Sequence, residues 1–140
     1  MAVATSTFKV TGWDEDRSST ETPRVRPASI TYDLPEMDGK ITSSYLMTYM
    51  SNGNATFVFT ETVLASNFFG KKGSFITQGQ GTFDSKTYAV EASFSIVAGT
   101  GTGDLADMAG KGTMVTKPSN EYSFEVWCNS GEHKPCSSKS

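Results

Sequence analysis

The stretch TYAVEASFSI, residues 87–96, alternates two kinds of side chain with a period of two. One face is Ser, Thr and Glu with a single Ala, and the other face carries Tyr88, Val90, Ala92, Phe94 and Ile96. Successive side chains of a β-strand point to opposite sides of the sheet, so this pattern predicts a strand with one buried face. SITYDL (residues 29–34) and YSFEVWC (residues 122–128) alternate in the same way. Because no window of a dozen residues has the 3.6-residue period of an amphipathic helix, we predict an all-β protein.

Turn residues divide the chain into segments of similar length. Asp-Gly at 38–39 and Asn-Gly at 52–53 are the pairs that tight hairpins favour. The expected strands lie near residues 5–13, 25–34, 40–50, 55–65, 72–82, 87–97, 111–117 and 121–128. A meander of this length leaves two unpaired edges unless it closes on itself. We therefore predict an eight-stranded antiparallel up-and-down barrel made of residues 1–128, followed by a flexible C-terminal tail at 129–140.

Composition narrows the class of protein. A chain of 140 residues is long enough for one domain with one core, and its nine Phe, five Tyr and two Trp argue against disorder. The net charge of −3 with 12 scattered Lys and Arg provides no basic stripe, so we expect no nucleic-acid partner. No apolar run approaches the roughly 20 residues of a membrane helix, so we expect no membrane partner. The start, MAVATSTFKV, lacks the regions of a secretory signal, and we expect a cytoplasmic protein.

The glycine-rich stretch IVAGTGTGDLADMAGKG, residues 96–112, has two interpretations. A phosphate-binding loop requires a helix directly after the glycines, and the residues that follow are too few and too rich in glycine to form one. Asp104 would also repel a phosphate. The second interpretation, which we favour, is a crossing between strands, where Gly99, Gly101 and Gly103 allow unusual backbone angles and close approach.

The same stretch carries a resemblance to a known class of protein. Val97, the Gly-Thr-Gly at 99–101, Leu105 and Met108-Ala109-Gly110 resemble the signature hairpin of allene-oxide-cyclase-like barrels, which include plant dirigent proteins. Within that class the chain is similar to a small microbial family that shares an early Trp before acidic residues (13–16), a G-x-x-G-S-F turn (70–75) and a G-x-F step (81–83). That family carries a Glu after its Gly-Thr-Gly, whereas this chain inserts Thr-Gly before Asp104. The resemblance spans residues 5–128 and implies a barrel whose lumen holds one small ligand, with cofactor-free cyclisation or isomerisation among the activities of the class.

One carboxylate stands among aromatic side chains in ATFVFTETV, residues 55–63. Glu61 shares a face with Phe57 and Phe59. On the lumen side this carboxyl group would be desolvated and its pKa raised, which suits a general acid or base near neutral pH. The alternative is a carboxylate at the rim, held by Lys71 or Lys72 or turned outward by a bulge. We select Glu61 as the leading catalytic candidate.

Tyrosines supply the other candidate site residues. Tyr45 and Tyr49 share a face with Ile41 and Met47, and on a lumen wall their hydroxyls could donate to a substrate oxygen. The alternative is a core role in which the hydroxyls reach backbone carbonyls. We predict Tyr45 and Tyr49 as catalytic partners of Glu61. The ligand-binding candidates are Tyr32, Phe57, Phe59, Tyr88, Phe94 and Trp13.

Metal and nucleophile chemistry find little support. His133 is the only histidine and lies between Cys128 and Cys136, with no second imidazole or close thiol pair to complete a metal site. The two cysteines either pair or remain free thiols. We expect no metal and no cofactor. The leading hypothesis is a cofactor-free cyclase or isomerase that holds a small, largely apolar metabolite in the lumen. The alternative is a non-catalytic small-molecule binding or interaction module, and assembly into a dimer or trimer is left open.

Overall fold

The structure, a computed structural model, describes residues 2–15, 24–117 and 119–128. Its elements are β1 (Ala2–Thr7), β2 (Lys9–Glu15), β3 (Arg24–Leu34), the 3-10 helix η1 (Pro35–Met37), β4 (Gly39–Tyr49), β5 (Ala55–Phe68), β6 (Lys71–Phe83), β7 (Val90–Ile96), β8 (Thr102–Gly103), β9 (Met108–Val115) and β10 (Glu121–Cys128). All strand pairs are antiparallel. The all-β antiparallel prediction is confirmed. In this described part of the chain, no helix is long and apolar enough to cross a membrane.

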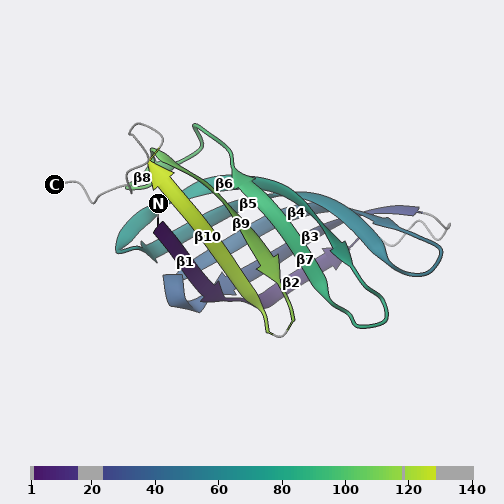
Figure 1. The fold of residues 1–140 in the computed structure, drawn as a ribbon. Helices are drawn as coiled ribbons and strands as arrows, with labels where there is room; N and C mark the ends of the chain where they lie inside the picture. Colours follow the sequence, from purple (N-terminus) through teal and green to yellow (C-terminus); the bar gives the residue numbers. More distant parts are fainter. Residues whose placement is uncertain (1, 16–23, 118, 129–140) are drawn as a thin grey trace.

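The strands form one curled, barrel-like sheet in the order β1-β10-β9-β7-β6-β5-β4-β3-β2, with β8 attached to β6. Figure 1 shows β1, β10, β9 and β7 passing in front of β3, β4 and β5, so that two parts of the same sheet face each other. The strands at the two ends of this order, β1 and β2, follow each other in the chain with Phe8 between them. The chain itself therefore links the two ends of the sheet.

Phe8 marks the point where the chain changes partner. Up to Thr7 it pairs with β10, and from Lys9 it pairs with β3. The Phe8 ring is buried and meets Tyr32 of β3 and Tyr122 of β10 edge to face, with ring centroids 5.2 and 5.1 Å away. Edge-to-face pairs of this kind stabilise an aromatic cluster beyond simple burial.

The residues that the structure describes form ten strands, where the sequence predicted eight. The expected first strand, residues 5–13, is divided at Phe8 into β1 and β2, because one straight strand cannot follow both β10 and β3. The second addition is β8, a two-residue strand inside the glycine-rich stretch. The remaining predicted strands correspond to strands of the structure with shifts at their ends.

Side chains alternate between the interior and the outer face along each long strand. β5 is the clearest example, since Ala55, Phe57, Phe59, Glu61 and Val63 are buried and the residues between them are exposed. Two stacks of rings fill the interior, one around Tyr45 and Phe59 and the other around Tyr122 and Phe124. The interior is thus largely filled with side chains, which leaves only a small space for a ligand.

The glycine-rich stretch, residues 96–112, is a crossing between strands, as the second interpretation predicted. Its strand β8 pairs with β6, and no helix follows the glycines in this segment. The Thr100 hydroxyl donates to the backbone oxygen of Val97 at 2.7 Å, and the Asp104 carboxylate accepts the backbone N–H of Lys72 at 3.2 Å. Side-chain-to-backbone bonds of this kind hold tight turns. The phosphate-binding interpretation is wrong.

Gly101 and Gly99 are required for different reasons. Gly99 has a φ of +83°, which side chains disfavour, and a Cβ there would meet open space. Gly101 does not have a positive φ; instead, a Cβ there would overlap the backbone carbonyl oxygen of Leu105. The expectation that Gly101 serves an unusual backbone angle is therefore wrong, and close approach to the buried Leu105 is the reason.

Candidate functional site

Glu61 is buried in the middle of the interior. Only 1% of its surface is exposed, and it follows Phe57 and Phe59 on the inner face of β5. The alternation of β5 continues unbroken through this position, because the bulge in the β5–β6 pairing comes only after Ala65. The predicted inward orientation of Glu61 is confirmed, and the alternatives of a rim carboxylate or an outward turn are wrong.

Three hydroxyl groups donate to the Glu61 carboxylate. Tyr122 of β10 donates to Oε2 at 2.7 Å, and Tyr45 of β4 donates to the same oxygen at 3.3 Å. Thr77 of β6 donates to Oε1 at 3.3 Å. Each carboxylate oxygen therefore has at least one partner, as a buried polar group requires.

Burial sets the ionisation of this cluster. It raises the pKa of Glu61 to about 7, although the hydrogen bonds from Tyr122, Thr77 and Tyr45 act in the opposite direction. Burial also raises the pKa of the Tyr45 and Tyr122 hydroxyls well above the ordinary value, and the nearby charge of Glu61 adds to that rise. Within the cluster, only Glu61 thus changes charge near neutral pH.

Tyr32 extends the cluster by one more hydroxyl. Its oxygen lies 3.0 Å from the Tyr45 hydroxyl, and either group could be the donor. Desolvation raises the pKa of Tyr32 as well, so its phenol also stays protonated. Glu61, Tyr45 and Tyr32 form a continuous chain of hydrogen-bonding groups across β5, β4 and β3.

A pocket of about 150 Å³ lies beside this chain of hydrogen-bonding groups. Tyr32 and Tyr45 line it, while Glu61 does not. The other lining residues are mainly apolar: Phe8, Val10, Trp13, Ile30, Met47, Tyr49, Phe57, Phe83, Val90, Met114 and Thr116. Trp13 and Val10 are the exposed members, which indicates the side on which the pocket opens. The structure thus separates the carboxylate from the space that a ligand would fill and places Tyr45 between them.

Tyr49 is not part of the Glu61 cluster. It lines the pocket, but its hydroxyl donates to Glu15 at 2.9 Å and the Arg24 guanidinium lies 4.8 Å above its ring. Trp13 lies in the same region, half exposed, and its indole N–H donates to Glu15 at 3.2 Å. The structure does not bring Tyr49 together with Glu61, because four residues along β4 separate Tyr49 from Tyr45 by about 13 Å. A catalytic role for Tyr49 stays a prediction.

Tyr88 is misplaced by the sequence prediction. It is 72% exposed and has a φ of +60°, in the turn between β6 and β7. Its backbone N–H donates to the Asp84 carbonyl at 2.7 Å, so the turn ends only after this residue. The last pair of the ladder is Phe83 with Val90, and the alternation that begins at Thr87 therefore starts before the strand does. Tyr88 does not line the pocket.

Three other aromatic candidates are buried but differ in position. Phe57 lines the pocket directly. Phe59 stacks on Tyr45 with ring centroids 5.0 Å apart and so packs against that side chain. Phe94 packs against Tyr122 and Phe124, away from the pocket.

Sequence reasoning missed Tyr122 and Thr77 as site residues. Tyr122 begins the alternating stretch YSFEVWC and was assigned only to the apolar face of a strand. Thr77 is a fully buried polar residue two positions after Phe75 on the inner face of β6. The available signal was a polar group at an inward position of a strand. This signal does not identify Glu61 as the partner of that group.

The cysteine and histidine predictions concern residues that the structure does not describe. His133 and Cys136 lie outside the described ranges, as does the side chain of Cys128. In the described part of the chain, no group of three His, Cys, Asp or Glu side chains could hold a metal ion. Pairing of the cysteines stays a prediction.

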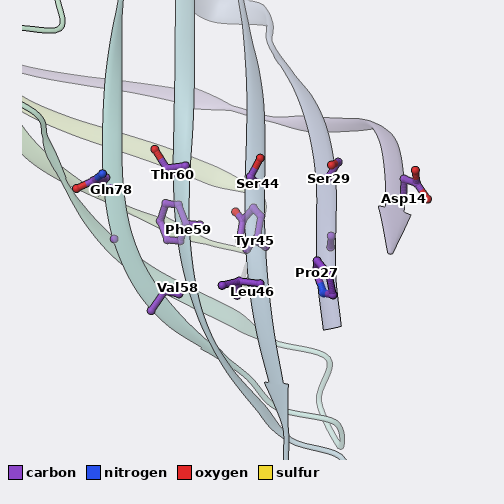
Figure 2. A pocket seen from close by; sticks show the side chains of 12 residues that line it. Asp14, Pro27, Ser29, Ser44, Tyr45, Leu46, Val58, Phe59, Thr60 and Gln78 are labelled. Atoms are coloured by element: carbon purple, nitrogen blue, oxygen red, sulfur yellow. The ribbon is translucent and has the colours of Figure 1, made fainter. Parts of the chain in front are cut away.

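A larger hollow, of about 680 Å³, lies on the outer face of β3, β4, β5 and β6. Figure 2 shows Leu46 and Val58 side by side in it, with Ser44 and Thr60 next along the same strands. Leu46 and Val58 are each about half exposed. This open surface would leave most of a small ligand in water, so the interior pocket is the better candidate site.

The fold and the site together define a class: an antiparallel β protein with a curled sheet and a small apolar pocket beside a buried, hydroxyl-bound carboxylate. A family model described as "Protein of unknown function (DUF3224)" matches residues 4–126, and the chain belongs to the DUF3224 family. No curated protein matches it.

Among solved structures, the chain is similar to a protein with unknown function from the DUF3224 family of Shewanella oneidensis MR-1. The crystal structure of that protein has a TM-score of 0.75 and 19% sequence identity to this chain, and the match covers 91% of this chain and 97% of the other. At this identity the likeness shows the fold alone. The finer resemblance to allene-oxide-cyclase-like barrels stays an expectation.

Proposed function

We propose that this protein binds a small, largely apolar molecule in the interior pocket, which is lined by residues of β2, β3, β4, β5, β6, β7 and β9. The observation that carries the proposal is the pocket itself, which is lined mainly by apolar side chains together with Tyr32 and Tyr45, whose hydroxyls contact each other. Apolar walls with a few convergent polar groups are typical of small-molecule sites.

The volume of the pocket limits the size of the ligand. An apolar cavity of about 150 Å³ holds a molecule close to the size of benzene, and this pocket has that volume. We therefore propose a ligand, or a portion of one, built on a single five- or six-membered ring. A polar substituent on that ring would meet Tyr32 or Tyr45.

A titration with benzene tests the binding proposal. We expect NMR signals of pocket residues such as Met47 and Phe57 to shift with a saturating dependence on benzene concentration. The Val90→Phe variant adds ring volume to the pocket wall and should abolish the shifts. Val58→Phe adds the same volume on the outer face and should leave them unchanged. Equal binding by both variants would place benzene elsewhere and remove the support for this pocket.

A cofactor-free cyclase or isomerase is the second candidate function. The observation that favours it is that Tyr45 contacts both the pocket and Glu61, whose pKa lies near neutrality. Through Tyr45, the carboxyl group could supply a proton to a ligand oxygen and take it back, as general acid–base catalysis requires.

Recovery of a natural ligand distinguishes the two candidates. Native mass spectrometry of protein purified from its host would reveal a bound metabolite, and that metabolite would then be incubated with fresh protein. An isomer of unchanged mass and altered chromatographic retention, formed by the wild type and not by Glu61→Gln, would support the enzyme. A ligand recovered unchanged from the wild type would support the binding module.

We also propose that the sheet closes into an eight-stranded barrel of the allene-oxide-cyclase-like class. Two features support the count: β1 and β2 can be read as one strand bent at Phe8, and β8 as a short addition to β6. A crystal structure in which β1 or β2 leaves its partner strand would contradict closure.

A further inference from the structure

We infer that hydrogen bonds link Tyr32, Tyr45 and Glu61 in a chain whose direction reverses when Glu61 takes up or loses a proton. The pocket then favours a ligand that donates a hydrogen bond when Glu61 is ionised, and a ligand that accepts one when Glu61 is protonated. This inference rests on the proposed binding function and specifies the class of ligand that the pocket accepts.

The ionised state fixes the direction of the chain. An ionised carboxylate is an acceptor only, so Tyr45 commits its single proton to Glu61 Oε2. In the 3.0 Å contact between the two phenols, Tyr32 must then be the donor. The Tyr32 oxygen is left with acceptor capacity and no proton for the pocket, so a ligand N–H or O–H is favoured there.

Protonation of Glu61 reverses this direction. A neutral carboxyl group, having taken a proton from solvent, must donate it to one of the three hydroxyls that contact it. Among the described residues, Tyr45 is the one of these three whose hydroxyl contacts a further hydroxyl, that of Tyr32. Donation to Tyr45 therefore lets Tyr45 donate to Tyr32 and frees the Tyr32 proton. A ligand carbonyl or ether oxygen in the pocket competes for this proton with the Ser43 hydroxyl, the other side-chain partner of Tyr32.

Among the side chains around it, Glu61 is the group that changes its protonation state near neutral pH. The titratable side chains that face it are Tyr45 from β4, Tyr122 from β10 and, one step further, Tyr32 from β3. β6 contributes the hydroxyl of Thr77 opposite Glu61, while Lys71 lies six residues along that strand, about 20 Å away. The buried side chains of β7 and β9, among them Phe94, Ile96 and Met114, include no titratable group. Because burial raises the pKa of Glu61 to about 7, both states are accessible in ordinary buffers.

Three probes of similar size test the reversal on the wild-type protein. Pyrrole has a donor and no strong acceptor, cyclopentanone has an acceptor and no donor, and benzene has neither. Dissociation constants would be measured by NMR titration at about pH 5.5 and about pH 8.5, on either side of the Glu61 pKa. We expect cyclopentanone to bind about threefold to tenfold more tightly at the lower pH and pyrrole to show the opposite change, the range that one net hydrogen bond provides. Benzene should bind equally at both.

Variants locate the effect in the chain. Tyr32→Phe removes the terminal hydroxyl and should abolish the opposed pH responses while benzene still binds. Tyr122→Phe is the matched control, because Tyr122 also donates to Glu61 but does not lead to the pocket. It should keep both responses and move their midpoint to higher pH.

The outcomes separate the two proposals. If benzene binds but pyrrole and cyclopentanone show the same pH dependence, the reversible chain is wrong and the binding function stands. If none of the three probes binds at either pH, the binding function itself fails. Opposed responses that survive in Tyr32→Phe would also overturn the chain, since its last member would be dispensable.

Discussion

Tyr122 and Glu61 are 61 residues apart in the sequence, and the Tyr122 hydroxyl donates a 2.7 Å hydrogen bond to the Glu61 carboxylate. Their strands, β10 and β5, are separated in the sheet by β9, β7 and β6. The bond therefore crosses the interior rather than running along the sheet. It joins opposite walls of the curled sheet at a buried carboxylate. We therefore expect the free energy of unfolding to depend strongly on this hydrogen bond.

Glu61 should make the stability of the fold depend on pH. The pKa of Glu61 is about 7 in the folded protein and 4.5 in the reference state. Below pH 4.5 both states hold the proton, and between 4.5 and 7 only the folded state does, so the free energy of unfolding falls across this window. The fall should reach about 3 kcal/mol and then level off above pH 7.

Urea denaturation of the wild type and Glu61→Gln across pH 4 to 8 measures this contribution. Other carboxyl groups titrate equally in both proteins, so the difference between the two curves isolates Glu61. We expect the free energy of unfolding of Glu61→Gln to increase relative to that of the wild type as the pH rises. A constant difference would mean that the Glu61 pKa is ordinary.

Tyr122→Phe should destabilise the protein more at high pH than at low pH. It removes the shortest hydrogen bond to Glu61, and a bond to a buried charged group is worth about 2 kcal/mol, roughly twice that of a bond to a neutral one. The measurement is again urea denaturation, at about pH 5 and about pH 8. Tyr88→Phe provides the control: its hydroxyl belongs to a 72% exposed side chain, and stability should not change. Equal losses for Tyr122→Phe at both pH values would argue against an ionised Glu61.

Phe8→Ala should be among the most destabilising substitutions. Phe8 is buried at the junction of β1 and β2 and contacts rings on β3 and β10, the strands next to the two ends of the sheet. Truncation of a buried Phe costs about 4 kcal/mol, because the contacts are lost and a cavity remains. Phe69→Ala, at a 44% exposed ring, is the matched comparison and should cost much less in the same denaturation experiment. Similar losses would show that the junction is held by other contacts.

The two glycines of the crossing should respond differently to alanine. Gly101→Ala places a Cβ against the carbonyl oxygen of Leu105 and should cost about 2 kcal/mol, a fall in Tm of roughly 6 °C. Gly99→Ala meets open space and only strains a positive φ, which costs about 1 kcal/mol. Thermal unfolding followed by circular dichroism compares them. A larger loss of stability for Gly99→Ala than for Gly101→Ala would mean that the positive φ of Gly99 matters more than the close approach of Gly101 to Leu105.

Local alternation in the sequence was enough to predict the strands and the inward position of Glu61. The period of two is a property of each strand on its own, so residues 55–63 already place Glu61 with Phe57 and Phe59. The alternation gave a wrong prediction at Tyr88, because the period of two extends in the sequence to residues that form a turn before β7 begins. There the Asp84 carboxylate accepts the backbone N–H of Lys86 at 2.8 Å, and this local bond competes with the strand ladder.

The partners of Glu61 were decided by the tertiary structure alone. Tyr122 reaches it because the sheet curls until β10 faces β5, and Tyr45 reaches it because β4 pairs with β5 in a register that aligns Tyr45 with Phe59. Strand order and curvature depend on contacts between residues far apart in the chain, which no local pattern encodes. The sequence by itself therefore determined that a carboxylate would be buried, and the curled sheet decided that three hydroxyls would hold it beside a pocket the size of a single ring.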